Sequence, residues 1–173
     1  RRSDSTARRA TSGISEAGND NDRDYLRALM VAARTYAVYN ILVPTKHSGE
    51  NFILDASSND QVYRGYGAEA RLSKVVQATL DTTGKAAFYE GDIAITPYFS
   101  QSDGRTRAWN EVWNGKKPWL ISKEDPCCAG NLLLGHGVGM SAAGARYFAK
   151  KKGWSWKKIL KYYYTGIQLK EIY

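Results

Sequence analysis

The spacing of apolar residues changes its period along this chain, and that change limits the folds the chain can adopt. In residues 22–40, and again in residues 68–80, apolar side chains recur every three to four positions, which predicts two amphipathic helices. Residues 85–99 instead alternate with a period of two on either side of a Glu-Gly turn, which is the pattern of a β-hairpin. Helices and hairpin strands are mixed without regular βαβ alternation, so the sequence predicts an α+β fold.

The C-terminal third repeats this mixture. A helix is expected over residues 140–152, ended by Gly153, and a second over residues 156–164, capped by Ser155. A final strand is expected over residues 167–173, and an earlier short one over residues 51–54. With 173 residues the chain fits a single domain, in which we expect several helices to pack on antiparallel hairpin strands.

The net charge of +8 is concentrated at the two ends of the chain. Residues 1–10 carry four arginines against one aspartate, and residues 146–173 carry eight lysines and arginines against one glutamate. A basic end can bind a polyanion such as nucleic acid, anionic lipid or a carboxylate-bearing wall glycan, or it can be a solvated helix face. No nucleic-acid-binding motif accompanies the charge, so nucleic acid is not an expected partner.

The sequence contains no long apolar segment. Its longest purely apolar runs, such as residues 132–134, are far shorter than the roughly 20 residues of a membrane span. Residues 1–12 are polar and basic, so we interpret them as a lead-in, which can belong to a longer chain, to a domain over residues 13–173. Any export signal or anchor is expected to lie outside this chain.

The two cysteines, Cys127 and Cys128, are adjacent, which leaves three alternatives open. They could form a strained ring with each other, remain free thiols or pair with another chain. Since the chain has only two histidines, a closed structural zinc site is not expected.

Two side chains are candidates for acid–base chemistry. Glu16 precedes the first helix and is either a general acid/base aimed into a cleft or an exposed acid that favours the helix start. His136 lies among three glycines in residues 135–139 and is a base, a ligand, a sugar contact or a residue bonded to its own turn. A nucleophile pairing His136 with Cys127 or Cys128 is conceivable, but no spacing supports it.

Four separated segments, in one order, resemble a known family. The segments are VAARTYAVYN (31–40), QVYRGYGAEA (61–70), PYFSQSDGRTRAWNEVW (97–113) and GHGVGMSAAGARYFAKKKGWSWKKILKYYYTG (135–166). Together they are similar to the stage II sporulation protein D domain, also called the SpoIID/LytB family, which covers peptidoglycan lytic transglycosylases and relatives described as enhancers of cell-wall amidases.

The resemblance implies a set of site residues. Family members place a catalytic glutamate sixteen positions before the first alanine of Ala-Ala-Arg-Thr-Tyr, and Glu16 stands at that distance from Ala32. Either Arg34 or Arg27 would hold a lactyl carboxylate of the glycan, and Tyr98 and the serines would orient sugar hydroxyls. The groove around Glu16 would be lined by Arg27, Arg34, Gln61, Tyr98, Ser100, Ser102, Thr106, His136 and Ser141.

The resemblance also implies a function, with departures. It implies an extracytoplasmic enzyme, without a cofactor, that acts on peptidoglycan glycan strands and has a cell-wall amidase or other envelope proteins as further partners. Some members bind zinc through cysteine and histidine, but this chain has Asp55, Asn59 and Asp60 there, so no zinc is predicted. Leu29 replaces a glutamine, and Ala17-Gly18 replaces Met-Pro, which keeps open a non-catalytic wall-binding or amidase-enhancing domain.

Overall fold

The computed structural model describes residues 22–172, except 44–45, 58, 62–66 and 68–70. Helix α2 (Arg23–Leu42) is its central element and contacts three other helices and the main sheet. The helix begins where the Asp22 carboxylate accepts a hydrogen bond from the Tyr25 N–H. In its predicted apolar stripe, Leu26 and Leu29 are almost inaccessible to solvent, and Met30, Ala33 and Ala37 are half-buried. This confirms the first predicted helix.

The main sheet contains three antiparallel strands in the order β2-β1-β5. Glu90 and Gly91 both have positive φ, at 51° and 100°, which is the geometry of the two-residue turns that match the twist of a hairpin. The final strand pairs along β1, from Lys85 opposite Glu171 to Phe88 opposite Gln168. The strands are β1 (Lys85–Tyr89), β2 (Asp92–Ile93) and β5 (Gln168–Glu171).

The hairpin is shorter than the sequence predicts. Residues 94–97 are irregular, and the chain then forms β3 (Tyr98–Phe99), which leaves the main sheet and pairs in parallel with β4 (Met140–Ser141). The strand expected over residues 51–54 is wrong, because that segment is an irregular loop of bends without ladder hydrogen bonds.

A close backbone approach holds the β3–β4 pair in place. A Cβ at Gly139, whose φ is +80°, would lie only 2.0 Å from the Pro97 carbonyl oxygen. The same oxygen accepts hydrogen bonds from the Met140 N–H at 3.2 Å and the buried Tyr164 hydroxyl at 2.9 Å. The glycine-rich segment is therefore fixed beside the start of β3.

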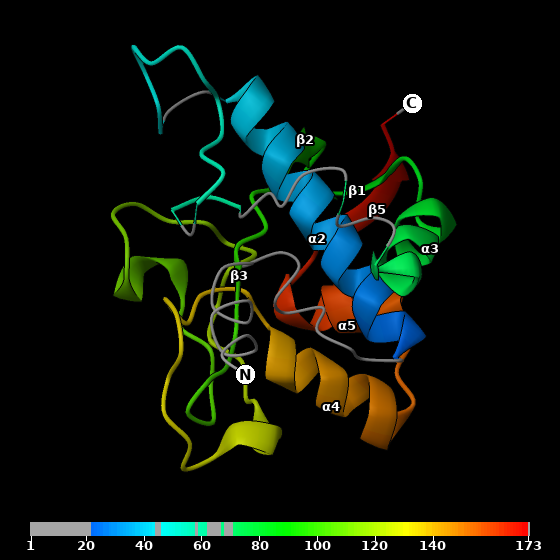
Figure 1. Cartoon of the computed structure of the whole chain (residues 1–173). Helices are drawn as coiled ribbons and strands as arrows, with labels where there is room; N and C mark the ends of the chain where they lie inside the picture. The colour runs from blue at the N-terminus through cyan, green and yellow to red at the C-terminus, as the bar shows by residue number, and fades with distance from the viewer. Residues whose placement is uncertain (1–21, 44–45, 58, 62–66, 68–70, 173) are drawn as a thin grey trace, which may run out of the picture.

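Three further α-helices pack against α2, with α3 on one side and α4 and α5 together on another (Figure 1). Ser141 caps one of them by accepting a hydrogen bond from the Gly144 N–H at 3.1 Å, and Gly153 ends it in the left-handed conformation, as predicted. None of the described helices combines the length and the apolar character needed to cross a bilayer. These helices are α3 (Ser73–Asp81), α4 (Ala142–Lys152) and α5 (Trp156–Tyr163).

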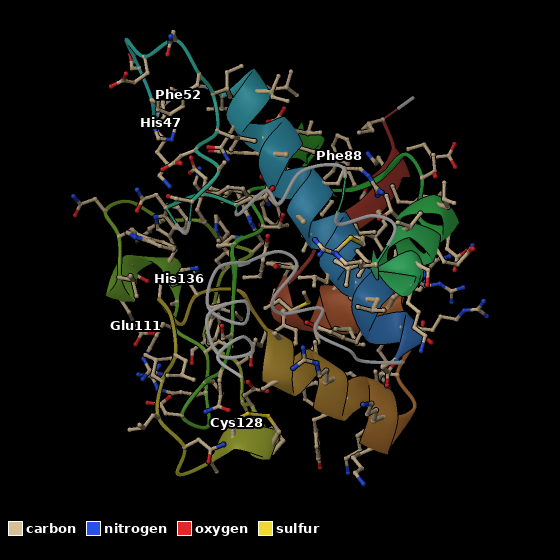
Figure 2. All side chains as sticks on the ribbon, viewed as in Figure 1. His47, Phe52, Phe88, Glu111, Cys128 and His136 are labelled. Atoms are coloured by element: carbon tan, nitrogen blue, oxygen red, sulfur yellow. A yellow bond between two sulfur atoms is a disulfide. The ribbon has the colours of Figure 1, made fainter. Side chains whose placement is uncertain are left out.

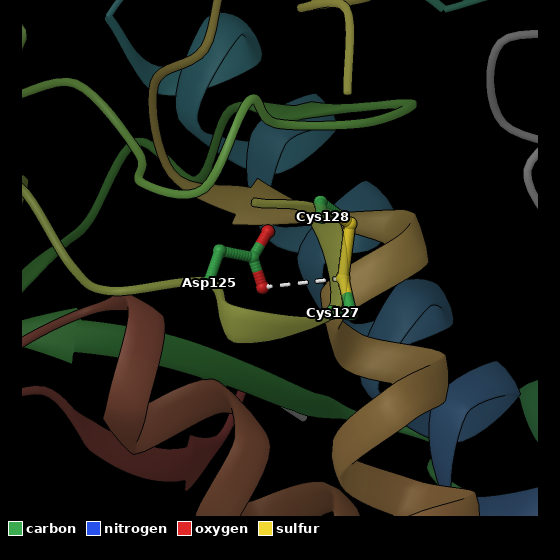
Figure 3. A group of neighbouring side chains, drawn as sticks. All are labelled: Asp125, Cys127 and Cys128. Carbon is green, nitrogen blue, oxygen red and sulfur yellow. Dashed lines mark hydrogen bonds between the residues drawn. A yellow bond between two sulfur atoms is a disulfide. The ribbon is translucent and has the colours of Figure 1, made fainter. Parts of the chain in front are cut away.

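A buried carboxylate connects α5 to the preceding loops. Asp125 accepts hydrogen bonds from the Ser102 hydroxyl at 2.7 Å and the Tyr163 hydroxyl at 2.9 Å. Beside it, Cys127 and Cys128 form a disulfide with each other, which resolves the three alternatives for these cysteines (Figure 3). The three residues lie close enough to share a metal ion, but disulfide sulfurs are not the thiolates that bind metals.

Substitution of Gly144 by alanine should destabilise the fold. Alanine is the better helix former by about 1 kcal/mol, so propensity alone predicts a gain. The added Cβ would, however, lie 1.8 Å from Asp125 Oδ1 and 2.1 Å from the Tyr163 hydroxyl oxygen. We expect Gly144→Ala to lower the free energy of unfolding by about 1–3 kcal/mol in urea titrations. Gly67→Ala is the control, because its Cβ would meet no atom within 4 Å; equal effects of the two substitutions would contradict this account.

Candidate functional site

The structure contains a cavity of about 700 Å³ between α2, the loop that follows it, β3, the segment 109–117 and the glycine-rich turn. We call it the aromatic cavity. Aromatic rings line it from three parts of the chain, and flat apolar rings beside polar groups are a surface on which sugar rings can stack and form hydrogen bonds. The aromatic lining consists of Tyr36, Tyr39, Tyr98, Phe99, Trp109 and Trp113.

His136 lies in the wall of this cavity with a fixed orientation. Its Nδ1 accepts a hydrogen bond from the Val138 N–H at 3.1 Å, so the neutral ring carries its proton on Nε2. The ring packs against Trp113 and Phe99, with centroid distances of 4.9 and 5.6 Å. Figure 2 shows His136 on the same side of α2 as His47, with Phe88 on the other side. His136 is thus bonded to its own turn, which was one of the alternatives, and it also faces the cavity.

The electrostatics of the cavity keep this imidazole neutral. Burial lowers the pKa of His136 to about 4; a hydrogen bond to the Tyr98 backbone opposes the shift, and the positive charge of Lys46 adds to it. At neutral pH, His136 therefore donates and accepts hydrogen bonds and brings no positive charge to the cavity.

Asp60 organises the loop on the opposite wall. Its side chain is fully buried and accepts hydrogen bonds from the Asp55 N–H at 2.7 Å, from His47 Nε2 at 2.6 Å and from the Lys46 ammonium. Burial alone would raise the pKa of Asp60, but the hydrogen bonds from Lys46 and the other donors outweigh it and hold this pKa below its usual range. The Tyr36 hydroxyl lies 3.4 Å from the same carboxylate, which connects this loop to α2.

Three of the predicted groove residues line the aromatic cavity: Tyr98, Ser100 and His136. The structure places four others in hydrogen bonds inside the fold. Ser102 donates to Asp125, Thr106 Oγ1 accepts from the Lys123 N–H at 2.8 Å, Gln61 Nε2 donates to the Ala33 carbonyl at 2.9 Å, and Ser141 caps α4.

The two predicted arginines contact the segment around α3. Arg27 donates twice to the Asp81 carboxylate, at 2.6 and 2.9 Å. Arg34 donates to the backbone carbonyls of Thr79, Thr82 and Lys85. Neither arginine is among the lining residues of the cavity. Glu16 lies outside the described residues, as does the expected lead-in at residues 1–12.

Several lining residues were missed by the sequence analysis. Tyr36, Tyr39 and Asn40 come from one face of α2, as their spacing of three and four residues allows, and this spacing was readable within the segment 31–40. Lys117 and Asp60 had no such signal, because both lie in irregular segments.

Comparison with known proteins supports the resemblance found in the sequence. Residues 14–89 match the family model described as "SpoIID: Stage II sporulation protein", which confirms that resemblance over this segment. The chain is also similar to a curated relative from Bacillus subtilis (strain 168), named "Amidase enhancer", at 36% identity over 100 residues. That match covers 58% of this chain but only 12% of the relative's length. Both findings support a role related to the cell wall.

The neutral state of His136 predicts a specific loss of stability in acid. Its pKa in the folded protein, about 4, lies below the unfolded value of 6.5, so the unfolded chain is protonated first as the pH falls. Stability should decline between pH 6.5 and 4, by about 2 kcal/mol at pH 5. Urea titrations at pH 7 and 5 should show this decline, and His136→Asn should remove that part of it. An imidazole NMR signal of His136 that titrates near pH 6.5 would contradict the assignment.

Removal of the Asp60 charge should loosen one wall of the cavity. Asp60→Asn leaves Lys46 without its counter-ion and weakens the hydrogen bonds that hold the loop, so we expect a loss of about 1–3 kcal/mol. Limited proteolysis should then cut the loop 46–57 faster than in the parent protein. Asp55→Asn is the matched control, because among the described residues the Asp55 carboxylate accepts hydrogen bonds from Ser57 and Asn59 of its own turn, while the Asp55 N–H bond to Asp60 is kept. If protease cuts the loop equally slowly in both variants, Asp60 does not hold the loop.

Proposed function

We propose that this domain is a peptidoglycan lytic transglycosylase. It cleaves the MurNAc–GlcNAc β-1,4 bond of stem-free glycan strands and leaves 1,6-anhydroMurNAc ends. The observation that carries the proposal is the aromatic cavity, whose rings and hydrogen-bonding groups suit a sugar chain and whose wall contains part of the family-matched segment. The reaction takes place outside the cytoplasm, where peptidoglycan is found.

The proton chemistry of the cavity favours a single acid supplied by Glu16. Among the lining residues that the structure describes, Asp60 is the sole carboxylate, and its hydrogen bonds keep it ionised. An ionised, fully bonded carboxylate cannot protonate a leaving oxygen, and a neutral His136 with a pKa of about 4 is also a poor donor. Glu16, which the family match includes, is the acid that remains from the sequence analysis.

One carboxyl group is sufficient for this reaction class. Hydrolases that cleave glycosidic bonds generally use two carboxylates, one as acid and one as base or nucleophile. In a lytic transglycosylase the C6 hydroxyl of the MurNAc sugar attacks its own C1 and closes the anhydro ring. Glu16 gives its proton to the departing GlcNAc oxygen and then takes the proton of the C6 hydroxyl, so it ends the cycle in its starting state.

A second candidate function is a non-catalytic domain that binds the wall and assists a cell-wall amidase. The relative named "Amidase enhancer" favours it. Leu29 also favours it, since this side chain is fully buried in the core and adds no polar group to the cavity. The two candidates share the same ligand and differ in whether a bond in that ligand is broken.

Substitution of Glu16 by glutamine tests the catalytic proposal. Glu16→Gln keeps the shape of the side chain but removes the proton, so formation of 1,6-anhydroMurNAc products from stem-free glycan should fall by about 100- to 10,000-fold. Mass spectrometry of the digests measures this. Glu90→Gln, at the exposed hairpin turn, is the control and should keep the parent rate. Full activity of Glu16→Gln would refute the assignment of the acid, and a parent protein that forms no anhydro product would leave the enhancer function.

A further inference from the structure

We propose that Lys117 binds a carboxylate of the ligand in the aromatic cavity and so determines which glycan this domain accepts. This inference rests on the proposed function and adds to it a specificity-determining residue. It replaces the arginines as the expected carboxylate ligands, because Arg27 and Arg34 are bonded to the segment around α3.

Lys117 is held in position by aromatic rings. Its ammonium nitrogen lies 3.1 Å from the Tyr39 hydroxyl and stands over the rings of Tyr39, Trp109 and Trp119, at 5.4, 5.9 and 5.5 Å from their centroids. Trp119 is itself fixed by a hydrogen bond from its Nε1 to the Ile95 carbonyl at 2.8 Å. A lysine is usually mobile, so three rings around one ammonium group reduce the entropy that ligand binding would cost.

The charge of Lys117 has no acidic partner among the residues that the structure describes. Lys46, the other described lysine in the cavity wall, is paired with Asp60, and His136 is neutral at physiological pH. An ammonium group has three donors, and the Tyr39 hydroxyl engages one of them. The cavity therefore offers a positioned positive charge to an incoming anion.

The chemistry of peptidoglycan supplies a matching anion. Each MurNAc sugar of a stem-free strand carries a free lactyl carboxylate, whereas the same carboxyl is an uncharged amide when a stem peptide is attached. GlcNAc has no such group, so a chitin oligosaccharide presents the same β-1,4 backbone and acetamido groups without the charge. By forming one ion pair beside stacked sugar rings, Lys117 can therefore distinguish stem-free glycan from peptide-bearing glycan and from chitin.

A binding experiment with two ligands tests this role. Affinities for stem-free glycan and for a chitin oligosaccharide of equal length are measured by calorimetry in a Glu16→Gln background, which prevents turnover. Lys117→Met keeps the length and apolar contacts of the side chain but removes the charge. We expect affinity for stem-free glycan to fall about tenfold or more, and affinity for chitin to change less than about twofold. Lys116→Met, at the exposed neighbouring position, should change neither.

The outcomes separate the two proposals. Equal losses for both ligands would mean that Lys117 only supports the rings, and unchanged binding of stem-free glycan would mean that its charge is not used; either result overturns the role of Lys117 alone. If the Glu16→Gln protein that keeps Lys117 binds neither ligand, the proposed glycan function fails, and the role of Lys117 fails with it. Thermal unfolding of each variant shows whether the fold is intact, and Lys117→Arg should restore most of the preference for stem-free glycan.

Discussion

The candidate site depends on one close approach between backbone segments some 40 residues apart in the sequence. The Pro97 carbonyl accepts hydrogen bonds from Met140 and Tyr164, and only a glycine at position 139 leaves it room to do so. This contact sets the short parallel pair of β3 and β4, and that pair places Tyr98 at the cavity beside the turn that carries His136. Two strands of two residues each have little stability of their own. Their geometry is therefore determined by the packing of a glycine and a tyrosine against one oxygen atom.

Two buried carboxylates, Asp60 in the cavity wall and Asp125 beside the disulfide, hold loops in place. Asp125 connects the loop containing Ser102 to α5, and Asp60 connects the turn that begins at Asp55 to Lys46 and His47, which follow α2. A carboxylate can accept several hydrogen bonds at once, so one buried acid can satisfy the donors of an irregular segment that has no ladder partner. This explains how the irregular segment around Asp60 can form a defined part of the cavity wall.

The sequence predicted those parts of the fold that have a period, and missed those that depend on single contacts. Helix α2 and the first hairpin were predicted because their apolar spacing repeats over enough residues to be recognised. No periodic pattern marks the point where the chain leaves the main sheet and forms β3, since this depends on the distant Gly139. Motif residues such as Ser102 and Ser141 were interpreted as sugar contacts, yet hydroxyl groups that cap helices or bond buried acids have the same sequence pattern as those that face a ligand. Only the three-dimensional arrangement separates these roles.

The contrast between arginine and lysine explains how positive charge is divided between fold and cavity. The guanidinium group has five donors in a rigid plane. In this protein Arg34 donates to three carbonyl oxygens, one in the last turn of α3 and two beyond its end, which a single ammonium group could not span. Lys117 has a compact charge that fits among three rings without needing several acceptors. An arginine bonded in this way is unsuited to capture a ligand, because binding would first break contacts that join α2 to α3. A lysine over aromatic rings loses few contacts when it forms an ion pair. The proposed binding of an anion in this cavity is therefore more consistent with Lys117 than with Arg27 or Arg34.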